Sequence, residues 1–154
     1  MWQRIQTVFL VIAIISLVLS IFFPIWTYND PLGQTHYLYP LEYSTIEKGV
    51  KNTTYLPYSI TAILAIAAAT LAFIEIGKYK NRVLQMKLGA LNSLFIAGTI
   101  ASAVIFSNQL MKTFHGGSYG LALWLPGIAV LCNLLANRFI RRDERIVRES
   151  DRLR

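Results

Sequence analysis

Long apolar runs alternate with shorter polar stretches along the 154-residue chain. A helix needs about 20 predominantly apolar residues to cross the hydrocarbon core of a bilayer, since each residue adds about 1.5 Å. Runs of this length occur near residues 7–27, 57–77, 84–107 and 119–140. The pattern therefore predicts an all-α membrane protein in which residues 1–140 form a four-helix transmembrane bundle.

The polar segment at 28–56 is the only long connection between the predicted helices. It opens with turn-forming residues at Asp30-Pro31 and Gly33, and β-prone residues follow from Thr35 to Ile46. We expect a small β-rich extracytoplasmic loop of two or three short strands between helices one and two.

Composition and charge support this assignment and add an orientation. The chain is 55% hydrophobic with a net charge of +7, and its basic residues cluster at 78–87 and 138–154. Positively charged loops stay in the cytoplasm, so both termini and the middle loop are predicted to be cytoplasmic in a multi-pass membrane protein. The lipid bilayer is then the first partner, and no direct nucleic-acid binding is expected.

The last segment, 141–154, is highly charged and directly follows an apolar run. If the fourth helix continues through it, a cytoplasmic C-terminal helix results, with apolar residues that share one face: Phe139, Ile140, Ile146, Val147 and Leu153. Acidic residues are interleaved with the arginines, which is not typical of a purely electrostatic arm. Three alternatives stay open: a solvated helix, a helix that docks on a cytoplasmic partner, and a helix that lies on the lipid surface.

Two groups of residues are candidates for contacts. The first could bind a protein partner at the cytoplasmic side: Arg4, Gln6, Arg141, Arg142, Arg145, Arg148, Asp151, Arg152 and Arg154. The second is predicted to pack helices together, through small residues spaced by four and through amides: Gly89, Ser93, Ala97, Ala101, Asn92, Asn133 and Asn137. A polar substrate site at the three asparagines is the alternative.

The sequence contains no recognisable catalytic, cofactor or metal motif, so no enzyme activity and no cofactor are expected. Cys132 is the single cysteine, which excludes a disulfide-shuttling oxidoreductase. Glu75 is predicted to pair with Lys78 or Tyr79 at the membrane interface, which disfavours a proton-coupled transporter. His36 and His115 are expected to be solvated loop residues.

Particular stretches of the chain resemble a known family. The opening MWQRIQTVFL, with Arg4-Ile5-Gln6-Thr7, and the tail RRDERIVRESDRLR, with Asp143-Glu144 and Val147-Arg148, are similar to uncharacterised Bacteroidota inner-membrane proteins of the domain of unknown function 4293. The resemblance covers essentially the whole chain. It implies four transmembrane helices and an inner-membrane location, and it implies no activity.

These observations favour a non-enzymatic accessory or scaffold subunit of a larger membrane complex, with one or more membrane-protein partners. Protein export or envelope biogenesis is a candidate host process. The alternative is a small-molecule transporter or a lipid-binding membrane protein that uses the bundle core near Asn92, Asn133 and Asn137.

Overall fold

The computed structural model describes residues 3–31, 33–79 and 81–152, and within them the chain forms four α-helices and five β-strands. The helices are α1 (Gln3–Phe22), α2 (Ile60–Gly77), α3 (Arg82–Phe114) and α4 (Leu121–Arg152). Each of these described helices is long and apolar enough to cross a membrane. This confirms the prediction of four membrane-length helices.

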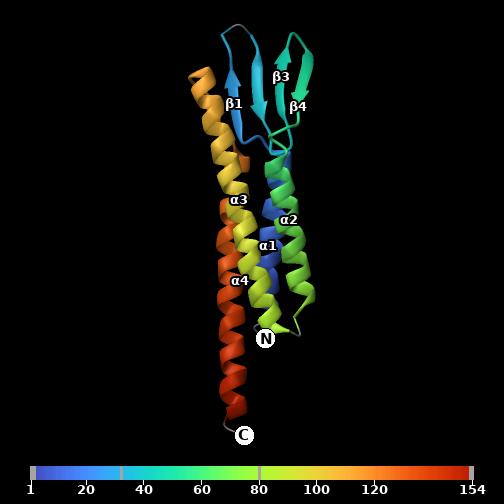
Figure 1. Ribbon diagram of the computed structural model, residues 1–154, viewed down its shortest axis with the longest axis vertical. Helices are drawn as coiled ribbons and strands as arrows, with labels where there is room; N and C mark the ends of the chain where they lie inside the picture. The colour runs from blue at the N-terminus through green and yellow to red at the C-terminus, as the bar shows by residue number, and fades with distance from the viewer. Residues whose placement is uncertain (1–2, 32, 80, 153–154) are drawn as a thin grey trace.

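The helices form an up-down-up-down bundle. Both α1 and α3 pack on α2 and on α4, so each helix contacts two neighbours. The strands lie at one end of the bundle, and the first and last described residues lie toward the other (Figure 1). We term these the sheet end and the terminal end.

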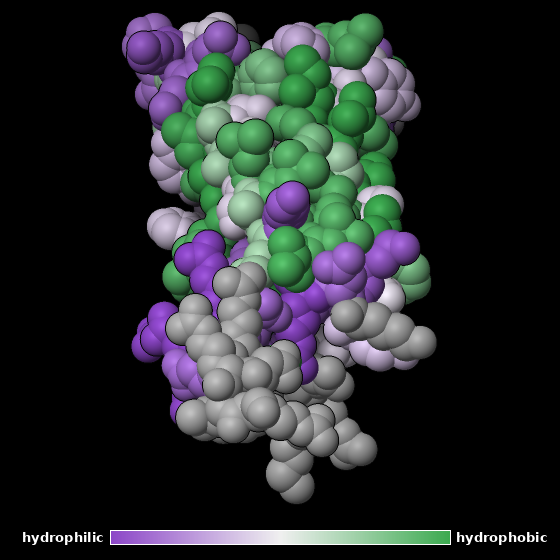
Figure 2. Space-filling model, turned by 60° about the horizontal axis from the view of Figure 1, so that its bottom comes forward, coloured by the Kyte–Doolittle hydropathy of each residue, from purple (hydrophilic) through white to green (hydrophobic). Residues whose placement is uncertain are grey.

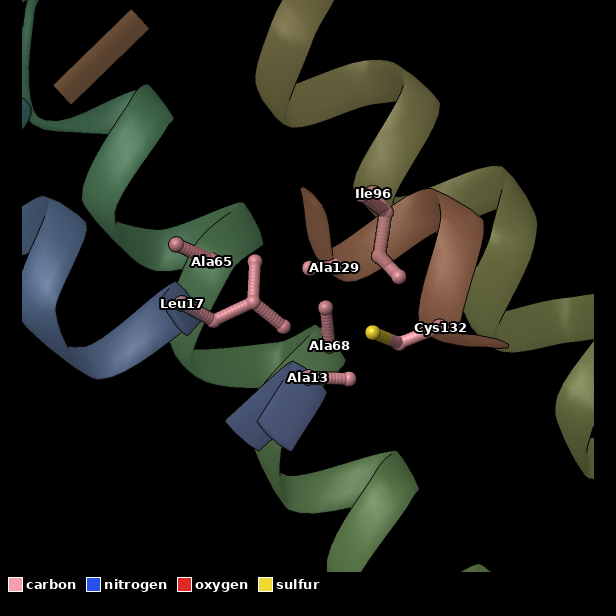
Figure 3. Close-up of a cluster of buried hydrophobic side chains, with 7 residues drawn as sticks. All are labelled: Ala13, Leu17, Ala65, Ala68, Ile96, Ala129 and Cys132. Atoms are coloured by element: carbon pink, nitrogen blue, oxygen red, sulfur yellow. The ribbon is translucent and has the colours of Figure 1, made fainter. Parts of the chain in front are cut away.

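Alanine side chains make up much of the interior of the bundle, whereas many large apolar side chains point outward. One core cluster consists of Ala13, Leu17, Ala65, Ala68, Ile96, Ala129 and Cys132 (Figure 3). Large apolar side chains such as Ile63, Phe73 and Leu94 are more than half exposed. Figure 2 shows a hydrophobic surface along the middle of one face, with hydrophilic groups gathered toward both ends. A lipid surrounding favours this arrangement, because small interfacial residues let helix backbones approach each other closely.

A five-stranded antiparallel sheet covers the sheet end, in the order β4-β3-β2-β1-β5. The strands are β1 (Trp26–Asn29), β2 (Thr35–Leu38), β3 (Tyr43–Glu47), β4 (Val50–Thr54) and β5 (Ser118–Tyr119). The predicted β-rich loop is therefore present, with four strands between α1 and α2. The fifth strand comes from the connection between α3 and α4, which the sequence pattern did not indicate.

One predicted helix boundary needs correction, and another helix continues into the predicted tail. The first helix ends at Phe22 and not near residue 27, because the apolar run continues past Pro24 as the start of β1. Proline lacks the N–H that a continuing helix would use. At the other end of the chain, α4 runs without a break from Leu121 to Arg152 and so passes through the predicted start of the tail at residue 141 as one helix.

The junction between the bundle and the sheet depends on Gly120. Its N–H donates to the carbonyl oxygen of Ile25 at 2.7 Å, and a Cβ there would lie 2.1 Å from the carbonyl oxygen of Pro24. The backbone cannot move away without breaking this hydrogen bond. Glycine is therefore required where the α3–α4 connection meets the end of α1.

We expect Gly120→Ala to lower the free energy of unfolding by about 1–3 kcal/mol, as overpacking typically does. Gly127→Ala is the matched control, since nothing lies within 4 Å of its added Cβ inside α4. That change is expected to be neutral or to stabilise by up to about 1 kcal/mol. Unfolding in mixed detergent micelles measures both, and equal effects would contradict the assignment.

Candidate functional site

A hydrogen-bonded amide cluster joins α3 to α4 in the half of the bundle nearer the terminal end. The Asn92 Nδ2 donates to the Asn133 Oδ1 at 3.2 Å. The Asn133 Nδ2 in turn donates to the Gly89 carbonyl oxygen at 3.0 Å and to the Ser93 Oγ at 2.8 Å. Asn92 and Asn133 are fully buried. These hydrogen bonds join α3 to α4 through Gly89, Asn92, Ser93 and Asn133.

Asn137 lies one helical turn beyond this cluster and packs directly against Gly89. A Cβ on Gly89 would lie 2.1 Å from the Asn137 Oδ1, so the asparagine occupies the space that a side chain would need. Asn137 is 7% exposed, and its Oδ1 has no hydrogen-bond partner among the described residues. Asn137 therefore lies between α3 and α4 and retains one hydrogen-bond acceptor without a partner among the described residues.

The small-residue stripe of α3 does not stay in the interface. Gly89 is buried and Ser93 is half-buried, but Ala97 and Ala101 are exposed. The prediction that the whole stripe packs inside the bundle is therefore wrong for these two alanines. A spacing of four residues turns about 40° per step in a helix with 3.6 residues per turn, so a strict repeat of four drifts off one face.

A second contact, which we term the terminal brace, ties the first turns of α1 and α3 to α4 through Gln6, Arg82 and Asp143. The Gln6 Nε2 donates to the Asp143 Oδ2 at 2.9 Å, and the Arg82 Nη1 donates to the Asp143 carbonyl oxygen at 2.9 Å. Gln6 is 6% exposed. It was predicted to contact a partner, and this is wrong because its amide is used inside the chain.

The terminal brace joins two stretches that are far apart in the sequence. Gln6 and Asp143 are separated by 137 residues. Nearby, the rings of Phe9 and Phe139 stack with their centroids 5.7 Å apart, and Ile140 is buried. The base of the charged tail is therefore part of the bundle, whereas Ile146 and Val147 further along α4 are exposed. Leu153 lies outside the described residues.

A groove of about 850 Å³ lies between α3 and α4 at the terminal end, and we term it the arginine groove. Its lining consists of Ala90, Ser93, Leu134, Asn137, Arg138, Phe139, Arg141, Arg142 and Arg145. Three of the predicted partner-contact residues, Arg141, Arg142 and Arg145, are thus brought together in one place. The side chains of Arg4, Arg148, Asp151 and Arg152 are not among those the structure describes, and Arg154 lies outside the described residues.

Glu75 lies in the interior, which contradicts the predicted pairing with Lys78 or Tyr79 at the interface. The residue is 0% exposed, and neither carboxylate oxygen has a hydrogen-bond partner among the described residues. Its carbonyl oxygen accepts from the Gln85 Nε2 at 2.9 Å, so α3 covers this end of α2. Nearness to the end of its own helix did not place Glu75 at the surface.

At the sheet end, His36 is also buried, so the prediction of a solvated histidine is wrong. Its Nδ1 lies 2.7 Å from the Tyr43 hydroxyl oxygen, and its ring centroid is 4.4 Å from that of Phe114. The residue occupies an inward position of β2, where alternate side chains face the core. His115 is exposed, as expected.

A second hollow, of about 610 Å³, lies between the sheet and the end of α1, with Tyr37 and Tyr39 in its lining. Glu42 and Lys51 also line it, and their side chains form an ion pair. The Lys51 hydrogen bond lowers the pKa of Glu42, and Glu42 raises the pKa of Lys51. Because the two charges neutralise each other, this hollow is less suited to a charged ligand than the arginine groove is.

Comparison with known families adds a classification. Residues 2–153 match the model of the family described as Domain of unknown function (DUF4293). No curated protein matches the chain. The family match confirms the resemblance carried by the opening residues and the tail.

The amide cluster predicts a coupled loss of stability. We expect Asn133→Leu and Asn92→Leu each to lower the free energy of unfolding by about 0.6–2 kcal/mol, because interhelical hydrogen bonds are lost inside an apolar surrounding. The double variant should cost less than the sum of the two, since both residues share one hydrogen bond. Unfolding titrations of all four chains measure this, and strict additivity would contradict the contact.

We expect Gln6→Leu to increase the motion of α4 just beyond Asp143, because the terminal brace loses its side-chain hydrogen bond. A nitroxide on an Ile146→Cys chain, in which Cys132 is replaced by alanine, should report faster motion once the Asp143 hydrogen bond is lost. Gln109→Leu makes the same chemical change at an exposed position near the sheet end and should leave the spectrum unchanged. Unchanged motion in the Gln6 variant would show that the contact does not hold the tail.

Proposed function

Because the chain belongs to the family described as Domain of unknown function (DUF4293), whose description carries no activity, we propose a function from the structure itself. The protein is a non-enzymatic, multi-pass inner-membrane protein that serves as an accessory or scaffold subunit of a larger membrane complex. Protein export and envelope biogenesis are the processes we propose as hosts.

The membrane orientation follows from where the charges lie. Lys78, Arg82 and Lys87 surround the α2–α3 connection at the terminal end, and the arginines of the last third of α4 lie at the same end. The sheet end carries a nearly balanced set of charges in residues 28–56. Under the positive-inside rule, this charge distribution supports a cytoplasmic terminal end and a sheet on the other side of the membrane.

One observation carries the proposal: α4 continues past the terminal brace as an uninterrupted helix to Arg152. Figure 1 shows this part of α4 extending beyond the other helices in the direction of its own span. A helix that binds the lipid surface lies in the plane of the interface, so it would have to turn where it leaves the bundle. We term this part of α4, residues 144–152, the arm. Because the arm keeps the direction of the span, it is better suited to contact a protein.

The exposed side chains of this arm have the chemistry of a helix that docks in a groove. Ile146 is 51% exposed and Val147 is 41% exposed, and charged residues surround them. An amphipathic helix of this kind commonly places its apolar residues in a hydrophobic groove of the partner, with charges at the rim. The terminal brace holds the base of the arm, which lowers the entropy lost on binding.

We expect a photo-cross-linking residue at Val147, in the full chain and in its native membrane, to yield one protein adduct of defined size. The same residue at Leu135, which is 39% exposed and lies in the apolar run before the first arginine of the tail, should yield none. Truncation after Glu144 retains the Asp143 brace and should abolish co-purification of that partner. The purified partner and the intact chain should then form a complex of fixed stoichiometry. Co-purification that survives the truncation would rule out the arm as the contact.

A small-molecule transporter that uses the bundle core is the second candidate, and the buried carboxyl group of Glu75 is the observation that favours it. Membrane-embedded acidic residues commonly mark ion or substrate pathways. The two candidates separate in a deletion strain. Complementation by Glu75→Gln but not by the chain truncated after Glu144 supports the scaffold, and the reverse supports the transporter.

A further inference from the structure

We propose that the arginine groove binds the phosphate group of an anionic phospholipid from the cytoplasmic leaflet. The inference rests on the membrane insertion and orientation in the proposed function, and it does not depend on the protein partner. It assigns the groove arginines to a lipid and leaves the exposed Ile146 and Val147 for the partner.

The arginines form a continuous cationic stripe on one side of α4. Arg138, Arg141 and Arg145 are spaced by three, four and seven residues, so they project within about 60° of one another around the helix. Seven residues correspond to about 10 Å along the axis. All three are exposed and line the groove. Guanidinium groups placed in this way present several N–H donors to one phosphate.

The arginines of this stripe repel one another unless an anion neutralises their charge. Like charges three and four residues apart on a helix repel each other. Among the described residues, no acidic side chain lines the groove, and no acidic side chain forms an ion pair with Arg138, Arg141 or Arg145. Asp143, which lies between Arg141 and Arg145 in the sequence, is already engaged with Gln6, and the neighbouring Glu144 does not line the groove. The charge of the groove therefore calls for a ligand from outside the chain.

The shape of the groove favours a lipid over a free phosphate ion. The lining begins at Ala90, Ser93 and Leu134, which lie in the apolar spans, and it ends at Arg145. Leu134 and Arg145 are separated by about 16 Å along α4, which is far longer than a phosphate ion needs. Apolar walls toward the membrane and guanidinium groups toward the cytoplasm match an amphiphile. Basic pockets between membrane helices on the cytoplasmic side are typical sites for anionic headgroups.

The test is native mass spectrometry of the full chain, released from micelles that contain equal amounts of phosphatidylglycerol and phosphatidylcholine. We expect bound phosphatidylglycerol to exceed bound phosphatidylcholine in the unmodified chain. The variant Arg141→Gln/Arg145→Gln should lose this preference by roughly fivefold for each arginine removed. The variant Lys78→Gln/Lys87→Gln removes the same charge from exposed residues at the same end, outside the groove, and should retain the preference.

A third variant tests the space instead of the charge. Ala90 is exposed and lines the groove, so Ala90→Trp should fill it and reduce bound phosphatidylglycerol while every arginine remains.

Unfolding midpoints like those of the unmodified chain show that the variants are folded. If both double variants lose the preference equally, or neither does, the groove is not the site. Displacement of the lipid by millimolar inorganic phosphate would overturn the lipid assignment in favour of a soluble anion. If the cross-linking experiment finds no protein partner, these lipid-binding outcomes are unaffected.

Discussion

The close contact of α3 and α4 at Gly89 is the interaction on which the rest of the structure depends. In the membrane that we propose for this chain, helices gain little from burying apolar surface, so close packing and hydrogen bonds across the interface would hold them together. Gly89 contributes to both. Its missing side chain leaves the space that Asn137 fills, and its carbonyl oxygen accepts from Asn133. A larger residue would separate the helices and remove the hydrogen bonds with them.

The walls of the arginine groove belong to the same contact. Ser93 accepts from Asn133 on one side and lines the groove on the other, and Asn137 packs on Gly89 and also lines the groove. The amide cluster thus fixes the distance between the two helices that form the groove. A site on rigid elements whose side chains are held by further hydrogen bonds keeps its geometry better than one on loops.

The apolar runs predicted the number and order of the helices, because length and hydropathy suffice for that in a chain of this kind. Contacts between distant residues could not be predicted in the same way. The pairing of β5 with β1 and the Gln6–Asp143 hydrogen bond join residues about ninety or more positions apart, and no local pattern encodes them. Glu75 was misplaced because depth in a bundle depends on the neighbouring helices and not on distance to the end of its own helix. The arginines were recognised as a group, but the groove they line depends on α3.

The side chains of the charged end of α4 have three different surroundings. Asp143 faces the bundle and belongs to the terminal brace, the arginines at 138, 141 and 145 face the groove, and Ile146 and Val147 remain exposed. A lipid in the groove would offset the repulsion among the arginines next to the base of the arm. If the lipid stiffens that base, the partner binds with less loss of entropy, and linkage requires the partner to strengthen lipid binding by the same factor. Lipid composition and complex assembly would then be coupled through a single helix.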